Sequence, residues 1–104
     1  MEFIYEKNRI YVNDAEGKMI VEATFPIIEE GVANVDHTWV DPSLRGQGVA
    51  SQLMHAVVKK ARELDLRLVG TCPYAQVWFK KHKTDVDIID WDMQEELHPE
   101  CKIV

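Results

Sequence analysis

Residues 40–51, Val-Asp-Pro-Ser-Leu-Arg-Gly-Gln-Gly-Val-Ala-Ser, mark the point at which this chain changes from strand to helix. Residues 31–40 alternate between two faces, and both faces include apolar side chains, which predicts a central strand of a sheet. Asp41-Pro42 ends that strand, because proline has no N–H to donate to a neighbouring strand. Over residues 46–64, apolar side chains recur at three- and four-residue steps, and this period predicts a long amphipathic helix.

The turn between strand and helix has the chemistry of an anion site. The first N–H groups of a helix have no partner within it, and the helix dipole adds about half a positive charge at that end. Gly46 and Gly48 have no side chains that would keep a phosphate from the backbone. Arg45 adds a guanidinium that can bind an anion through two hydrogen bonds, and Ala50 places only a small side chain at the start of the helix. The alternative is that the two glycines only shape the turn. Neither the G-x-G-x-x-G fingerprint nor a Walker A sequence is present to explain it.

The remaining segments complete a mixed α/β (α+β) pattern. Residues 3–12 indicate two short strands or one bent strand, residues 18–25 alternate as a half-buried strand that ends at Pro26, and residues 66–70 form a further short strand. A second helix is expected over residues 74–82, with Pro73 in its first turn and Trp78 and Phe79 as packing residues. Residues 85–104 fit an edge strand, a loop or a short helix. The predicted order is β-β-β-β-α-β-α: an antiparallel meander followed by a right-handed βαβ unit with parallel pairing.

Length and composition indicate one globular domain over residues 1–104. The chain has 104 residues, of which 46% are hydrophobic and 29% are charged. No apolar run approaches the ~20 residues that span a bilayer, and the first residues lack the basic region of a signal peptide, so we expect a cytoplasmic protein without a membrane contact. Cys72 and Cys101 are expected to be free thiols, and the absence of a C-x-x-C pair predicts that no metal is bound.

The charge of the chain is concentrated in an acidic C-terminal extension. The formal net charge is −6, and residues 84–104, with seven acidic residues and one basic residue, account for the whole excess. Residues 1–83 therefore carry no net charge. A nucleic-acid-binding domain normally has a basic excess, so we expect no nucleic acid partner.

Two motifs resemble those of a known superfamily. Residues 45–50, Arg-Gly-Gln-Gly-Val-Ala, are similar to the Q/R-x-x-G-x-G/A signature of the GNAT superfamily of N-acetyltransferases. The chain most resembles its small stand-alone branch, called the YjdJ type, which pairs a motif like His37-Thr38-x-Val40 with a later segment like Cys72-Pro73-Tyr74-Ala75. The resemblance covers about residues 2–82, with both motifs in the expected order.

The resemblance implies a fold, an activity and a cofactor site. It implies a GNAT-like mixed sheet and an acetyl-CoA-dependent N-acetyltransferase, with an acyl-CoA and an amine as its partners, working as a monomer or weak homodimer. The alternatives are a non-catalytic coenzyme A or acyl-CoA-binding module or sensor and, less favoured, a phosphate- or nucleotide-binding regulator. Larger members of the superfamily use additional N-terminal helices to form the acceptor site, so the acceptor stays undefined. The residues expected at acetyl-CoA are Val40, Arg45, Gly46, Gln47, Gly48, Val49, Ala50 and Ser51.

Three residues are candidates for catalysis. Cys72 precedes a helix N-terminus, where thiolates are favoured, and the resemblance suggests an active-site thiol that accepts the acetyl group or protonates the leaving thiolate; it can equally be a small buried apolar residue. His37 can be the base that deprotonates an ammonium acceptor, or a hydrogen-bonded histidine of the sheet. Tyr74 can donate to the departing thiolate, contact the cofactor, or belong to the core. A backbone N–H near Val40 is expected to polarise the thioester carbonyl.

Overall fold

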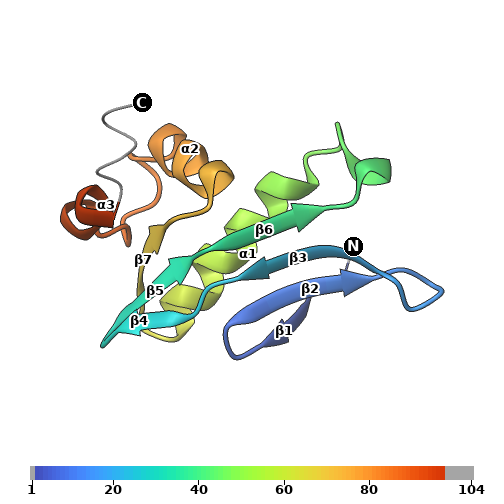
Figure 1. The fold of residues 1–104 in the computed structure, drawn as a ribbon, viewed down its shortest axis with the longest axis horizontal. Helices are drawn as coiled ribbons and strands as arrows, with labels where there is room; N and C mark the ends of the chain where they lie inside the picture. The colour runs from blue at the N-terminus through green and yellow to red at the C-terminus, as the bar shows by residue number, and fades with distance from the viewer. Residues whose placement is uncertain (1, 98–104) are drawn as a thin grey trace.

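The computed structural model describes residues 2–97, which form two β-sheets and three α-helices around one apolar core (Figure 1). The larger sheet is antiparallel throughout and has the strand order β1-β2-β3-β6. Its strands are β1 (Ile4–Glu6), β2 (Arg9–Asn13), β3 (Met19–Thr24) and β6 (His37–Val40). Residues 3–12 therefore form two strands, and the predicted antiparallel meander is confirmed.

The smaller sheet contains the predicted parallel pair. Its strands are β4 (Ile27–Glu29), β5 (Val32–Val35) and β7 (Arg67–Gly70), in the order β4-β5-β7. β5 runs parallel to β7, and the long helix α1 (Val49–Glu63) lies between them in the chain, which confirms the crossover unit. β4 was not predicted, because a three-residue strand directly after Pro26 has too short a pattern to be recognised.

The expectation of one continuous strand over residues 31–40 is wrong. The chain leaves the smaller sheet after Val35 and enters the larger sheet at His37. His37 pairs with Thr24, and the N–H of Asp36 also reaches Thr24 O, at 3.3 Å, so two residues of one strand oppose a single residue of the other. This is a β-bulge, which changes the direction of a strand. As a result, β5 is central in its sheet, whereas β6 is an edge strand.

One face of the larger sheet packs on α1. Val21 and Ile10 from the strands, and Leu53 and Met54 from the helix, have no exposed surface. α1 starts three residues later than predicted, at Val49, because the preceding residue is Gly48 in the left-handed conformation. The helix α2 (Pro73–Lys81) matches the prediction within one residue at each end. Trp78 and Phe79 are buried in the core, as expected of packing residues.

The start of the acidic extension packs on the edge of β7. Leu68 forms an isolated parallel bridge with Ile89, and residues after it form α3 (Trp91–Leu97), so the segment combines strand-like pairing with a short helix. The buried side chain of Gln94 accepts from Gly70 N at 2.6 Å and donates to Gly70 O at 2.8 Å. Cys101 and the end of the extension lie outside the described residues. Within residues 2–97, no helix combines the length and apolarity that crossing a bilayer requires.

The two bonds between Gln94 and Gly70 make a stability prediction. We expect Gln94→Ala to lower the free energy of unfolding by about 1–3 kcal/mol, because both bonds to the buried backbone are lost. Urea denaturation followed by circular dichroism measures this change. Glu96→Ala, at an exposed position of the same helix, is the matched control and should stay within about 0.5 kcal/mol of the wild type. Equal stability of both variants would contradict this role of Gln94.

Candidate functional site

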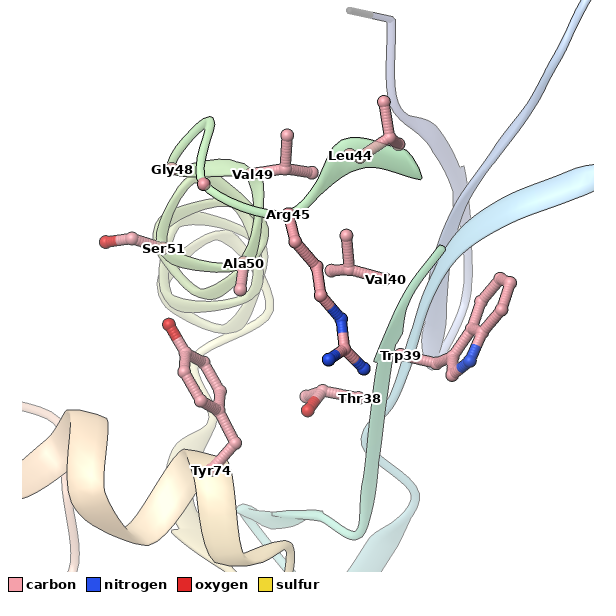
Figure 2. A pocket seen from close by; sticks show the side chains of 11 residues that line it. Thr38, Trp39, Val40, Leu44, Arg45, Gly48, Val49, Ala50, Ser51 and Tyr74 are labelled. Atoms are coloured by element: carbon pink, nitrogen blue, oxygen red, sulfur yellow. The ribbon is translucent and has the colours of Figure 1, made fainter. Parts of the chain in front are cut away.

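A cleft of about 410 Å³ lies between β6, the start of α1 and the start of α2 (Figure 2). It contains most of the residues predicted to hold a cofactor. The lining residues are Thr38, Trp39, Val40, Leu44, Arg45, Gly46, Gly48, Val49, Ala50, Ser51 and Tyr74. Gln47 is the one predicted loop residue outside this lining. Although Trp39 borders the cleft, Figure 2 shows its indole pointing away from it.

The loop at the top of the cleft is held in shape by Asp41. The Asp41 carboxylate accepts from Ser43 N at 3.0 Å and from Ser43 Oγ, and so caps a single 3-10 turn, Pro42–Leu44. These two hydrogen bonds hold the pKa of Asp41 below its usual value. The chain then turns through Gly46 and Gly48, with φ of 81° and 72°, a conformation that costs other residues about 1–2 kcal/mol. The glycines therefore do shape the turn, in addition to any part in binding.

The N-terminus of α1 is open to the cleft. Gly48 is its N-cap and has no side chain to accept from the first N–H groups, and the first turn contains no acidic residue. Arg45 extends its guanidinium into the same cleft (Figure 2). Unpartnered N–H groups, a positive dipole end and a cation together make an environment suited to a phosphate or diphosphate.

The free edge of β6 provides a second set of donors. Asp41 N donates to Ile20 O across the antiparallel pair, and such bonds recur at every second residue. The N–H groups of Thr38 and Val40 therefore point away from β3, towards the cleft that both residues line. They can donate to carbonyl groups of an extended ligand. This agrees with the donor expected near Val40 and adds Thr38, which the sequence analysis named only as part of a motif and gave no role.

Cys72 lies where the two sheets part and contacts Thr38, which lines the cleft. Its Sγ is 3.2 Å from Thr38 Oγ1, and its N–H donates to Val35 O at 3.1 Å. Only 7% of the residue is exposed, and it is not among the residues that line the cleft. The thiol therefore links the start of α2 to β6.

Tyr74 is placed to act as a proton donor. It lines the cleft with 38% of its surface exposed, and its hydroxyl points towards the start of α1 (Figure 2). Partial burial raises the pKa of Tyr74 above its usual value of 10.0, so the phenol is protonated at neutral pH. The neighbouring Ser51 Oγ accepts from Trp78 Nε1 at 3.1 Å, which fixes the start of α1 against α2.

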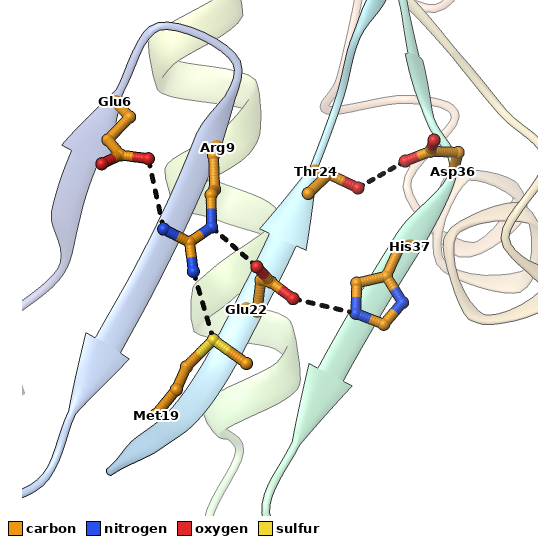
Figure 3. A network of polar contacts seen from close by, with 7 residues as sticks. All are labelled: Glu6, Arg9, Met19, Glu22, Thr24, Asp36 and His37. Atoms are coloured by element: carbon orange, nitrogen blue, oxygen red, sulfur yellow. Dashed lines mark hydrogen bonds and ion pairs between the residues drawn. The ribbon is translucent and has the colours of Figure 1, made fainter. Parts of the chain in front are cut away.

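His37 lies on the face of the larger sheet that is turned away from α1 (Figure 3). Its Nε2 is 3.2 Å from Glu22 Oε1, and Arg9 Nε donates to Glu22 Oε2 at 2.6 Å. Hydrogen bonds to Glu22 and then to Glu6 raise the pKa of Arg9, which stays cationic. The sequence analysis missed Arg9 and Glu22, because the contacts of Glu22 with Arg9 and with His37 depend on the register of three strands. The only local signal is that Glu22 is a carboxylate between two core residues of a strand.

The chain is similar to acetyltransferases over most of its length. The family model for GCN5-related N-acetyl-transferase matches residues 9–88. A GCN5-like protein from Staphylococcus aureus, whose assignment as an N-acetyltransferase is itself a prediction, is 33% identical with a TM-score of 0.71, and the match covers 85% of this chain and 86% of that one. No curated protein matches the chain.

Longer proteins share the fold with lower similarity. One from Klebsiella pneumoniae, described as an acyl-CoA N-acyltransferase by prediction, is 26% identical with a TM-score of 0.53, over 71% of this chain and 54% of that one. A Mycobacterium tuberculosis protein solved in complex with CoA is 18% identical with a TM-score of 0.60, over 73% of this chain and 47% of that one, which is a likeness of fold alone. This chain thus spans about half of each. The assignment of this chain to the narrower YjdJ-type branch stays a prediction.

The raised pKa of Tyr74 is open to direct measurement. We expect the 295 nm absorbance titration of the wild type, minus that of Tyr74→Phe, to show one phenol that ionises above pH 10. Any stability that the neutral phenol contributes is present below the pKa of the unfolded chain and is lost as the pH rises through the higher folded value. Circular dichroism at each pH checks that the protein is still folded. A difference curve with its midpoint below pH 10 would contradict the burial of Tyr74 seen here.

Proposed function

Because this chain belongs to the family of GCN5-related N-acetyltransferases, we propose that it transfers an acetyl group from acetyl-CoA to an amine. The observation that carries the proposal is the open N-terminus of α1, which faces the cleft beside Arg45. A diphosphate is the part of coenzyme A that such a terminus would hold. Coenzyme A is bound on this fold in the Mycobacterium tuberculosis protein.

The residues of the cleft suit the different parts of the cofactor. The N–H groups at the start of α1 and the Arg45 guanidinium would hold the diphosphate, and Gly46 and Gly48 let the backbone approach it. The free edge of β6 would pair with the extended arm through Val40 and Thr38. Gln47 lies outside the lining, so its predicted part in binding would be limited to the rim of the loop.

The chemistry requires an activated acyl carbon, which the bound thioester supplies. We assign the chain three tasks in a direct attack by the amine. The Thr38 or Val40 N–H polarises the acyl carbonyl, because a donor fixed in advance stabilises the negative charge that develops on the oxygen. Tyr74 holds its proton at neutral pH and can deliver it to a sulfur leaving group from within the cleft. Binding both reactants side by side removes the need for a further encounter.

Cys72 has two possible parts in this scheme. Its sulfur lies next to Thr38, a residue that lines the cleft, which suits a thiol that accepts the acetyl group or serves as an acid. Its burial and its bond to Thr38 equally suit a structural link between α2 and β6. We favour the structural part, because direct attack needs no covalent intermediate.

Cofactor binding tests the first half of the proposal. We expect isothermal titration calorimetry to detect acetyl-CoA binding, and Arg45→Ala to weaken it roughly ten- to a hundredfold, because a charge-assisted hydrogen bond contributes about 1.5–3 kcal/mol. Arg62→Ala, with the same loss of charge at the opposite end of α1, is the control and should bind as the wild type does. The absence of any heat at millimolar acetyl-CoA would remove the cofactor assignment.

Transfer of label from acetyl-CoA to amines tests the second half. We expect Tyr74→Phe to lower kcat by about a hundredfold, within the range for loss of a general acid, while acetyl-CoA still binds. Cys72→Ala should keep kcat within a few fold of the wild type, and intact-protein mass spectrometry should find no acetylated wild type. Loss of turnover in Cys72→Ala together with acetylated Cys72 would replace direct attack by a covalent route. Binding without transfer to any amine would favour a binding module.

A further inference from the structure

We propose that Glu22 and Arg9 hold His37 as the base that deprotonates the acceptor, and that this acceptor is a cationic amine bound on the face of the larger sheet turned away from α1. The inference rests on the proposed acetyl transfer and assigns the half of the reaction that the cleft leaves open. Three strands meet in this group: Arg9 comes from β2, Glu22 from β3 and His37 from β6 (Figure 3).

The contacts of Glu22 determine which nitrogen of His37 is available. Glu22 Oε1 lies 3.2 Å from His37 Nε2. A carboxylate oxygen carries only lone pairs and attracts a proton on the facing nitrogen, so we assign the proton of the neutral ring to Nε2 and its lone pair to Nδ1. Nδ1 is therefore the atom that can take a proton from a substrate. The ring is accessible for this, because 49% of the His37 side chain is exposed.

Glu22 is itself held in one orientation. Its other oxygen accepts from Arg9 Nε at 2.6 Å, and only 17% of its side chain is exposed. Arg9 is in turn fixed by Glu6, at 3.2 Å, and by the Tyr11 ring, 3.9 Å below its guanidinium. A carboxylate held in this way aligns the imidazole and stabilises the positive charge that forms when His37 takes a proton.

The position of His37 connects this face with the cleft. It directly precedes Thr38, which lines the cleft and contacts Cys72. β6 is the edge strand of its sheet, and we place the amine on the face of His37 with its nitrogen directed around that edge to the acyl carbon. The bulge brings Asp36 to the same face as His37. Asp36 contacts Thr24 and His37 contacts Glu22, and these two partners share one face of β3 because they are two residues apart.

The charge of this face suits an ammonium group. Glu6, Glu22 and Asp36 contribute three carboxylates there, against the single guanidinium of Arg9. An ammonium must lose a proton before its lone pair can attack. His37 Nδ1 takes that proton; the amine then forms the C–N bond while the C–S bond of the thioester breaks with its electrons on sulfur. Two protons leave the nitrogen in total: one ends on the thiol through Tyr74, and one passes through His37 to water.

A double-mutant comparison tests whether Glu22 acts through His37. With labelled acetyl-CoA and spermidine or a short lysine-containing peptide as acceptor, we expect His37→Gln to lower kcat about a hundredfold and Glu22→Gln about tenfold. Glutamine cannot replace Glu22. If its amide oxygen accepts from His37, its NH₂ group faces Arg9 Nε, which is also a donor. The double variant should be no slower than His37→Gln alone. All variants should bind acetyl-CoA with unchanged affinity, and the control Glu29→Gln, on exposed β4, should keep full turnover.

Two further readouts separate this inference from a purely structural effect. Long-range ¹H–¹⁵N spectra of the wild type should show the neutral His37 ring with its proton on Nε2, a preference that Glu22→Gln should lose. The opposite tautomer, or wild-type turnover in His37→Gln, would overturn the inference and leave the proposed function standing. An equal loss from Glu22→Gln in both backgrounds would also overturn it. A wild type that binds acetyl-CoA but acetylates no cationic amine would end both proposals.

Discussion

The parting of the two sheets at Asp36 is the constraint on which the site depends. Up to Val35 the chain pairs with β7, and from His37 onward it pairs with β3. The bulge opposite Thr24 makes this change of partner possible within one residue. If residues 31–40 continued as one strand beside β7, the N–H groups of Thr38 and Val40 would be used in the sheet. Because β7 pairs with β5 and not with β6, whose partner is β3, these groups face the cleft instead.

The same change of partner divides the chemistry between two faces. One set of β6 side chains, Thr38 and Val40, lines the cleft beside the positive end of α1, where an anion is favoured. On the opposite face, His37 contacts Glu22 in a setting that is acidic overall, where a cation is favoured. The proposed transfer of an acetyl group from an anionic cofactor to an amine would use both environments. The strand β6 separates these two environments, and both adjoin its free edge.

The described part of the acidic extension is structural, because Ile89 pairs with Leu68 and Gln94 bonds both polar groups of Gly70 at the edge of β7. Gly70 precedes the turn into α2, which carries Cys72 and Tyr74. The added Cβ of any other residue at position 70 would lie 3.0 Å from Phe79 Cε2, so this turn is closely packed from both sides.

Local chemistry was sufficient for the elements whose signals lie close together in the chain. The period of α1, the turn residues Gly46 and Gly48, and Pro73 at the start of α2 were read correctly, because periodicity, left-handed glycines and proline act within a few residues. Most of the loop predicted to hold the cofactor accordingly lines the cleft. Contacts between distant strands could not be read in this way. The bulge at Asp36 and the placement of Glu22 against His37 depend on strand register, which is set by the packing of the whole core and by no neighbouring residue.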